Sequence, residues 1–405
     1  MIQTKAHANT HTYFDHNATT PVCKEVLAAL PEFAEAWGNA SSIHWAGRQP
    51  KNIIRDARKA VADAVGASSL EIIFTVGGSE ANNTVIKGVF EHNQSAQFLP
   101  AEQRRRTHYM CSAVEHPAVF KTMMHMKSLG VRVDVIPVNR KGEIDLKFYE
   151  EHLTEETALV SVMFANNETG TLFPIKQMAE MAHAKGALFH TDAVQAFGKV
   201  PVNLHELGVD FASFSGHKFY SIKGSGFLYS RKGSNFSPLI HGGAQERHRR
   251  GGTENTMGIG CLGVVAKRVS MIEDKARTVR ALRDHMEKRL VSEIADVTVT
   301  AGESPRLPNT SSLVLLGVDG ETMLMSMDIK GYAVSTGAAC SSGNPEPSPV
   351  LLAMGLTRDE AQNSLRVSLG WDTTLEQVDS FVETLKAVVA RLRSLKDDEG
   401  DSLHV

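Results

Sequence analysis

The sequence contains only four cysteines in 405 residues, Cys23, Cys111, Cys261 and Cys340, and they lie far apart. This spacing fits neither a disulfide scaffold nor a metal-ligand motif. No stretch approaches the roughly 18–20 consecutive apolar residues that a membrane-spanning helix needs. The first sixteen residues lack the apolar run and cleavage site of a secretory signal. We therefore expect a cytoplasmic protein, in a reducing compartment, with no resident metal and no membrane partner.

An excess of charge of one sign is also missing. The chain has 43 basic and 46 acidic residues and a net charge of -3. A protein that binds nucleic acid or a membrane surface would carry a basic excess, so we expect no direct nucleic-acid partner. The one candidate basic patch is "ERHRR" (246–250), and such a run is more typical of a solvated loop.

Hydrophobic residues make up 42% of the chain, which is enough to bury a sizeable core. From about residue 50 to 330, segments with helical spacing alternate with short apolar or β-branched runs. The expected helices include 52–66 and 175–186, and the expected strands are 71–75, 107–116, 158–165, 187–194, 210–218 and 224–230. This alternation predicts an α/β fold with a mostly parallel sheet covered by helices.

The pattern changes after about residue 265. Longer helices are expected near 270–292 and 373–394, with short strands at 297–300, 311–318 and 364–370. We therefore predict a large domain over 17–265 and a smaller α+β domain made of 1–16 plus 266–405. The strand at 12–16 joins the small domain or links the two. The charged tail 396–405 is either disordered, which we favour, or part of a partner surface.

Polar residues follow several of the expected strands, at the sheet edge where α/β proteins bind ligands. "FTVGGSE" (74–80) ends a strand in a glycine turn, with Gly78 and Ser79 at the start of a helix. Backbone N–H groups at such a helix start favour an anion such as phosphate. The same motif also fits an ordinary strand–helix turn, and it lacks the lysine of a P-loop.

Asp192 and Gln195 follow another apolar strand in "FHTDAVQ" (189–195). A carboxylate at the end of a buried strand needs a partner, and either a protonated ring nitrogen or a helix N-terminus would serve.

"SFSGHKFY" (213–220) places Ser215, His217 and Lys218 after a further strand. Lys218 lies between Phe214 and Phe219. A lysine in such surroundings can be desolvated, which lowers its pKa and makes it a nucleophile. A Schiff base with a carbonyl cofactor is the chemistry that uses such an amine.

Together these motifs resemble the cysteine desulfurases of the NifS/IscS type, which belong to the class V aminotransferase group of fold-type I pyridoxal-phosphate enzymes. The resemblance spans nearly the whole chain and implies a seven-stranded-type sheet in the large domain. It is carried by "YFDHNATTPV" (13–22), "EHPAV" (115–119), "NNETG" (166–170), "HTDAVQAFGK" (190–199), "SFSGHKFY" (213–220), "HGGAQERHRRGGTEN" (241–255), "TGAACSSGNPEPSPVLLAMGL" (336–356) and "SLRVSLG" (364–370).

The resemblance implies roles around pyridoxal 5'-phosphate. Lys218 would hold the cofactor covalently, and Asp192 would pair with its pyridine nitrogen. His116 would lie over the ring and assist proton transfer. Gln195 and Asn167 would contact the phenolic oxygen and the substrate side of the ring, and Arg366 would bind the substrate carboxylate. The phosphate would be held by Gly78, Ser79, Ser215 and His217. Thr253 would complete the phosphate site from the neighbouring subunit of a homodimer.

The resemblance also implies the reaction. Cys340 would take the sulfur of L-cysteine as a persulfide and leave L-alanine. The sulfur would then pass to an acceptor protein such as an iron–sulfur scaffold, for cluster assembly or other sulfur-containing biomolecules. Cys340 would contact iron only as a transient ligand through its persulfide. The small residues around it, "TGAACSSG" (336–343), suit a loop that moves between the active site and an acceptor.

Other readings stay open. Another class V enzyme, such as a selenocysteine lyase or an aminotransferase, would keep Lys218 and Asp192 without depending on Cys340. A non-catalytic scaffold could keep the fold alone. Apart from the resemblance, His116 and Asn167 could be turn residues and Arg366 a surface arginine. Cys23, Cys111 and Cys261 receive no role.

Overall fold

The computed structural model describes residues 11–95, 106–337 and 346–402, the side chains of residue 95 and of 396–402 excepted. Its larger sheet has seven strands in the order β2-β8-β7-β6-β5-β3-β4. β8 runs antiparallel to both of its neighbours, β2 and β7, and all other pairs in this sheet are parallel, which confirms the predicted mostly parallel sheet. The strands are β2 (Ile72–Thr75), β3 (His108–Ser112), β4 (Arg132–Ile136), β5 (Thr157–Ser161), β6 (Leu188–Asp192), β7 (Phe211–Ser215) and β8 (Gly226–Ser230).

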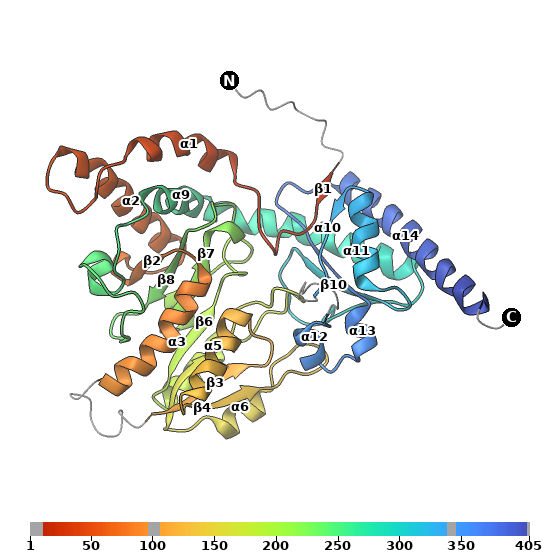
Figure 1. The fold of residues 1–405 in the computed structure, drawn as a ribbon, viewed down its shortest axis with the longest axis horizontal. Helices are drawn as coiled ribbons and strands as arrows, with labels where there is room; N and C mark the ends of the chain where they lie inside the picture. Colours follow the sequence, from red (N-terminus) through yellow and green to blue (C-terminus); the bar gives the residue numbers. More distant parts are fainter. Residues whose placement is uncertain (1–10, 96–105, 338–345, 403–405) are drawn as a thin grey trace.

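Helices cover both faces of this sheet (Figure 1). Alternate side chains of β7 show the two layers, because Phe211 packs in one hydrophobic cluster and Phe214 in another. All five residues of β7 are buried, and its sequence combines apolar residues with small serines. The helices are α1 (Lys24–Glu35), α2 (Arg48–Ala64), α3 (Gly78–Ser95), α5 (Pro117–Ser128), α6 (Leu146–His152), α7 (Ile175–Ala184), α8 (Leu204–Leu207) and α9 (Thr256–Ala266).

The second part of the molecule contains a three-stranded antiparallel sheet with the order β12-β10-β9. Its long helices, α10 and α14, pack against each other beside this sheet (Figure 1). The elements are β1 (Thr12–Tyr13), α10 (Ile272–Glu293), β9 (Val297–Val299), β10 (Thr310–Leu315), α11 (Gly320–Ile329), β11 (Tyr332–Ala333), α12 (Pro349–Ala353), α13 (Arg358–Gln362), β12 (Ser364–Ser368) and α14 (Leu375–Ser402).

The N-terminal segment packs with this second part. β1 pairs with β11, and Phe14 lies in a separate hydrophobic cluster with Val279 and Phe381. Residues of α12 and α13 instead join the cluster beneath the large sheet. The boundaries after residues 16 and 265 therefore stay a prediction, with both hydrophobic clusters as their physical basis.

The expectation of disorder for the tail was wrong over residues 396–402, because α14 continues to Ser402. None of the helices in the described ranges is long and apolar enough to cross a lipid bilayer.

Candidate active site

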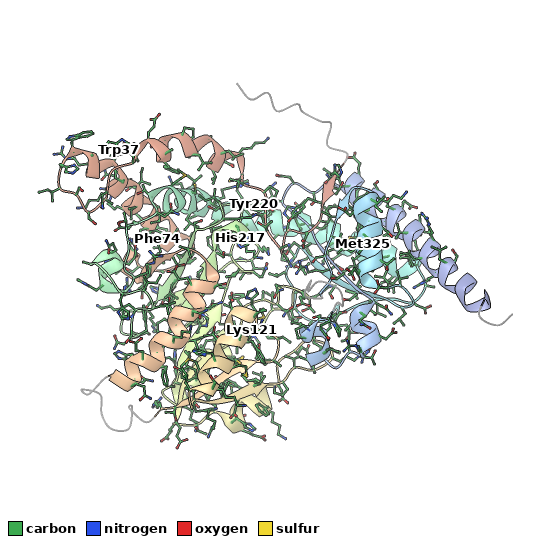
Figure 2. The ribbon with its side chains drawn as sticks, viewed as in Figure 1. Trp37, Phe74, Lys121, His217, Tyr220 and Met325 are labelled. Atoms are coloured by element: carbon green, nitrogen blue, oxygen red, sulfur yellow. The ribbon has the colours of Figure 1, made fainter. Side chains whose placement is uncertain are left out.

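A cavity of about 300 Å³ opens at the carboxyl ends of β6 and β7, beside the start of α3. Figure 2 shows His217 near the boundary between the large sheet and the small domain. All sequence-predicted residues of the described ranges except Thr253 line this cavity, namely Gly78, Ser79, His116, Asn167, Asp192, Gln195, Ser215, His217, Lys218 and Arg366. Residues almost 290 positions apart thus meet at one place.

The predicted anion-binding turn lies at one end of the cavity, where β2 passes into α3. A side chain at Gly78 would bring its Cβ within 2.6 Å of Val194 Cγ2, so any other residue would force the stiff, β-branched Val194 side chain to move. Ser215 and Ser79 present hydroxyl groups beside the first N–H groups of α3. Desolvation and the charge of Lys218 lower the pKa of His217 to about 4, so its imidazole is neutral near pH 7. His217 is therefore a hydrogen-bonding group here, and its Nδ1 lies 3.1 Å from Thr19 Oγ1.

Lys218 follows β7 in a short 3-10 turn, Gly216–Lys218. Its Nζ donates hydrogen bonds of 2.7 Å to the backbone carbonyls of Asn17 and Ala18. Desolvation and the positive charge of Arg366 lower the pKa of Lys218 to about 8. The desolvation predicted from the flanking phenylalanines is thus present, and the amine can lose its proton near neutral pH.

Asp192 ends β6 and is only 5% exposed. Its Oδ2 accepts a 2.7 Å hydrogen bond from Asn82 Nδ2, and its Oδ1 accepts a 3.0 Å bond from the backbone N–H of Val194. These neutral donors keep a buried carboxylate hydrogen-bonded without cancelling its charge. The charge remains available to a cationic group in the cavity.

His116 caps the N-terminus of α5, and its Nδ1 accepts a 3.1 Å hydrogen bond from the N–H of Ala118. In the neutral ring the proton is therefore on Nε2. Desolvation lowers the pKa of His116, and the nearby Asp192 charge opposes that shift. Because Nδ1 is engaged with Ala118, Nε2 is the ring nitrogen that can exchange a proton with a group in the cavity.

Arg366 lies on β12 and brings a guanidinium from the small domain to the cavity. Its Nη2 pairs with Asp15 Oδ1 at 2.7 Å, and its Nη1 donates to the backbone carbonyl of Asn167 at 3.2 Å. Its buried Nε has no partner among the described residues. Arg366 is 8% exposed, so it is no surface arginine, and its unused donor suits a carboxylate.

Sequence reasoning missed two buried residues, Asn17, which lines this cavity, and Lys199, which contacts Asn17 and Gln195. Asn17 accepts hydrogen bonds at its backbone carbonyl from Gln195 and Lys218. Lys199 is 7% exposed and donates to Asn17 Oδ1 at 2.9 Å and to Gln195 Oε1. A lysine within the apolar run "AVQAFGKV" (193–200) was the available signal for the second of these.

Among the predicted residues that the structure describes, Thr253 is the one not at the cavity. Thr253 is exposed and lines a separate pocket with Arg250 and Glu246, so its role from a neighbouring subunit stays a prediction. Cys340 lies outside the described residues.

The surroundings of Thr253 correct one interpretation. "ERHRR" is not simply a solvated loop, because Glu246 is buried and pairs with Arg58 at 2.7 Å, while Arg250 pairs with Glu80 at 3.0 Å.

Two of the remaining cysteines, Cys111 and Cys261, are buried. Burial raises the pKa of Cys261 to about 11 and raises that of Cys111 as well. Neither is a thiolate near neutral pH, which supports giving them no role.

A second, mostly apolar cavity of about 750 Å³ shares His116, Asn167 and Arg366 with the first. Its other lining residues include Phe120, Val350 and Gly337. It therefore extends from the site towards the last described residue before the segment that carries Cys340.

The donor set fits a pyridine ring that carries an aldehyde and a phosphate. The cavity is large enough for such a ring. It is lined by an amine that can lose its proton near neutral pH, a buried carboxylate and a turn in which a side chain at Gly78 would crowd Val194. The unpartnered Asn82 Oδ1 and Arg366 Nε add buried polar atoms that a ligand would satisfy.

Residues 12–381 of the chain match the class-V aminotransferase family. The chain belongs to this family. Within it, the chain belongs with the cysteine desulfurases, since it is 42% identical over 385 residues to cysteine desulfurase IscS of Dictyoglomus turgidum, covering 95% of each protein. It is also 42% identical to cysteine desulfurase NifS of Azotobacter vinelandii, covering 95% of this chain and 94% of that relative.

Solved structures agree with this placement in the class-V aminotransferases. A NifS-like protein superposes with a TM-score of 0.85 at 35% identity, covering 94% of this chain and 99% of its own. SspA in complex with cysteine superposes with a TM-score of 0.76 at 33% identity, covering 88% and 98%. The predicted fold class and family are confirmed.

Proposed function

We propose that the protein is a pyridoxal 5'-phosphate-dependent cysteine desulfurase that converts L-cysteine to L-alanine and leaves a persulfide on Cys340. The observation that carries the proposal is the convergence of Lys218, Asp192, His116 and Arg366 on one cavity of a class-V aminotransferase.

The lining of the main cavity supports specific roles for its residues in holding the cofactor. Lys218 Nζ would bond its aldehyde carbon, and Asp192 would face its pyridine nitrogen. The start of α3 would bind its phosphate together with Ser215 and His217, completed by Thr253 of a second subunit in a homodimer. When bound, pyridoxal phosphate supplies an electron sink that stabilises negative charge at the substrate Cα.

Arg366 would bind the substrate carboxylate with the fork of its guanidinium, and Asn167 would contact the same side. Asp15 and the Asn167 carbonyl orient that guanidinium. This contact would hold the Cα proton of L-cysteine towards Lys218 and the sulfur towards the second cavity.

Proton transfer would fall to two bases. Lys218 Nζ, with a pKa of about 8, can accept the Cα proton and return it near neutral pH. His116 Nε2 can carry a proton to or from the substrate on the other side.

Sulfur transfer would belong to Cys340. Its thiolate attacks the substrate sulfur, so that an S–S bond forms and the C–S bond breaks. The electron pair of the C–S bond stays with Cβ, which takes up a proton and becomes the methyl group of alanine. The persulfide would then pass its sulfur to an acceptor protein, such as an iron–sulfur scaffold, in the cytoplasm.

Alanine formation from L-cysteine, with excess reductant, tests the proposal in wild type and Cys340→Ala. We expect alanine and sulfide from wild type, and loss of both in Cys340→Ala with the cofactor still bound. Equal activity of the two proteins would contradict the role of Cys340. A wild type that binds pyridoxal phosphate but releases no alanine would contradict the substrate and favour another class V reaction.

A further inference from the structure

Lys199 is a buried amine that the proposed reaction does not use. It is 7% exposed, and none of the ion pairs formed by the described residues includes it. Its Nζ donates only to amide oxygens, Asn17 Oδ1 at 2.9 Å and Gln195 Oε1. Burying an amine without a carboxylate partner is costly, so such a group calls for an explanation.

The contact with Gln195 has a geometric consequence. A side-chain amide can present either its oxygen or its nitrogen to a neighbour, and rotation by half a turn exchanges them. An ammonium group offers only N–H donors, so a charged Lys199 selects the oxygen. A neutral amine still donates to that oxygen, while the Asn17 carbonyl, which can only accept, selects the nitrogen. Gln195 Nε2 is thereby turned away from Lys199, and it donates at 2.9 Å to the Asn17 carbonyl that also accepts from Lys218.

The orientation of Gln195 matters because this side chain lines the main cavity together with Lys218. We infer that Lys199 is a positioning residue, which fixes the Gln195 amide so that a hydrogen-bond donor faces the phenolic oxygen of a cofactor held on Lys218. This inference rests on the proposed function, since it concerns the bound cofactor. It goes further by making the donor character of Gln195 depend on Lys199.

Burial and the charges of Lys218 and Arg366 lower the pKa of Lys199 well below its usual range. Loss of the proton would leave two N–H donors, one for each amide oxygen. The positioning role therefore holds in both protonation states.

The visible absorbance of the bound cofactor, followed against pH, tests this inference without measuring activity. A donor to the ring oxygen stabilises its deprotonated form, so Lys199→Met should raise the apparent pKa of the absorbance change by about one unit. Gln195→Met should give a similar shift. If Lys199 acts through Gln195, the double variant should shift no further than either single variant.

Lys185→Met is the matched control, because it makes the same change at an exposed lysine and should leave the midpoint at the wild-type value. If Lys199→Met does not fold, Lys199→Gln still offers an N–H donor and should keep the midpoint close to wild type. A wild-type midpoint in folded Lys199→Met, additive shifts in the double variant, or a full shift in Lys199→Gln would overturn the inference. A wild type that takes up no pyridoxal phosphate would instead overturn the proposed function, and with it this inference.

Discussion

The floor and the wall of the main cavity hold their charges in different ways. The floor is formed by Asp192, Gln195 and Lys218, which lie at or just after the ends of β6 and β7, and Lys199 contacts it through Gln195. Side-chain amides and backbone carbonyls surround these charges. The wall is formed by Arg366 from the small domain, which makes a direct ion pair with Asp15 and lines the adjoining second cavity together with Glu168 of the large domain. Neutral partners leave a charge free to act on a ligand, whereas an ion pair fixes a side chain in one orientation.

This difference separates chemistry from recognition. On the floor, desolvation brings the pKa of Lys218 down to about 8, where the amine can exchange a proton. On the wall, Asp15 and the Asn167 carbonyl hold the Arg366 guanidinium in place to bind the substrate carboxylate. Variants on the floor should therefore abolish catalysis or change its pH dependence, while variants on the wall should change substrate affinity or stability.

The largest effect is expected from the floor. Lys218→Ala removes the nucleophilic amine and the proton carrier together, so alanine formation should fall by at least about 10³-fold. The visible absorbance of a covalently held cofactor should disappear as well. Lys223→Ala, at an exposed lysine five residues on, should retain both. Residual covalent cofactor in Lys218→Ala would show that another amine forms the bond.

A smaller effect is expected from the wall. Arg366→Lys keeps the charge but loses the bidentate fork, so KM for L-cysteine should rise about 10²-fold with a smaller change in kcat. Steady-state alanine formation measures both constants. Arg358→Lys, at an exposed arginine paired with Glu346, serves as the control. A fall in kcat at unchanged KM would place Arg366 in the chemical step and remove the distinction between floor and wall.

The low pKa of Lys218 predicts how the apoenzyme takes up its cofactor. Only the neutral amine attacks an aldehyde, so the rate of covalent uptake should rise with pH and level off above about 8. With an ordinary lysine, the uptake rate would continue to rise until the pH reached the usual lysine pKa of about 10.4. Stopped-flow absorbance between pH 6 and pH 10 measures the profile, with a change of about tenfold between pH 7 and pH 9 expected from the neutral fraction. A rate that still rises steeply above pH 9 would show that the floor does not desolvate Lys218.

Much of this arrangement could be predicted from the sequence, for identifiable reasons. Strands buried on both faces leave continuous apolar runs, and the polar residues that follow them, such as Asp192 and Lys218, stand out. β4 was missed because Arg132 and Asp134 interrupt its apolar pattern. The contacts of Asn17 and Lys199 were missed because each depends on segments far apart in the chain, and spacing along one segment carries no information about them.

Glu168 gives the smallest and most local test of the wall. Its carboxylate accepts a hydrogen bond from Ser348, which begins α12, and burial raises its pKa to about 7 despite that bond and the charge of Arg366. A carboxyl whose folded pKa lies above its unfolded value binds more protons when folded. The contribution of Glu168 to the free energy of unfolding is therefore lost as the pH rises from about 4.5 to about 7.

Glu168→Gln keeps an oxygen for Ser348 and removes this titration. The free energy of unfolding of the variant minus that of wild type should therefore be about 1 kcal/mol larger at pH 8 than at pH 5, after discounting for residual solvent screening. Urea unfolding at both pH values measures the difference, and Glu150→Gln at an exposed position of α6 should show no such change. A gain at pH 5 as large as at pH 8 would mean that Glu168 destabilises the wall through its shape and not through its charge.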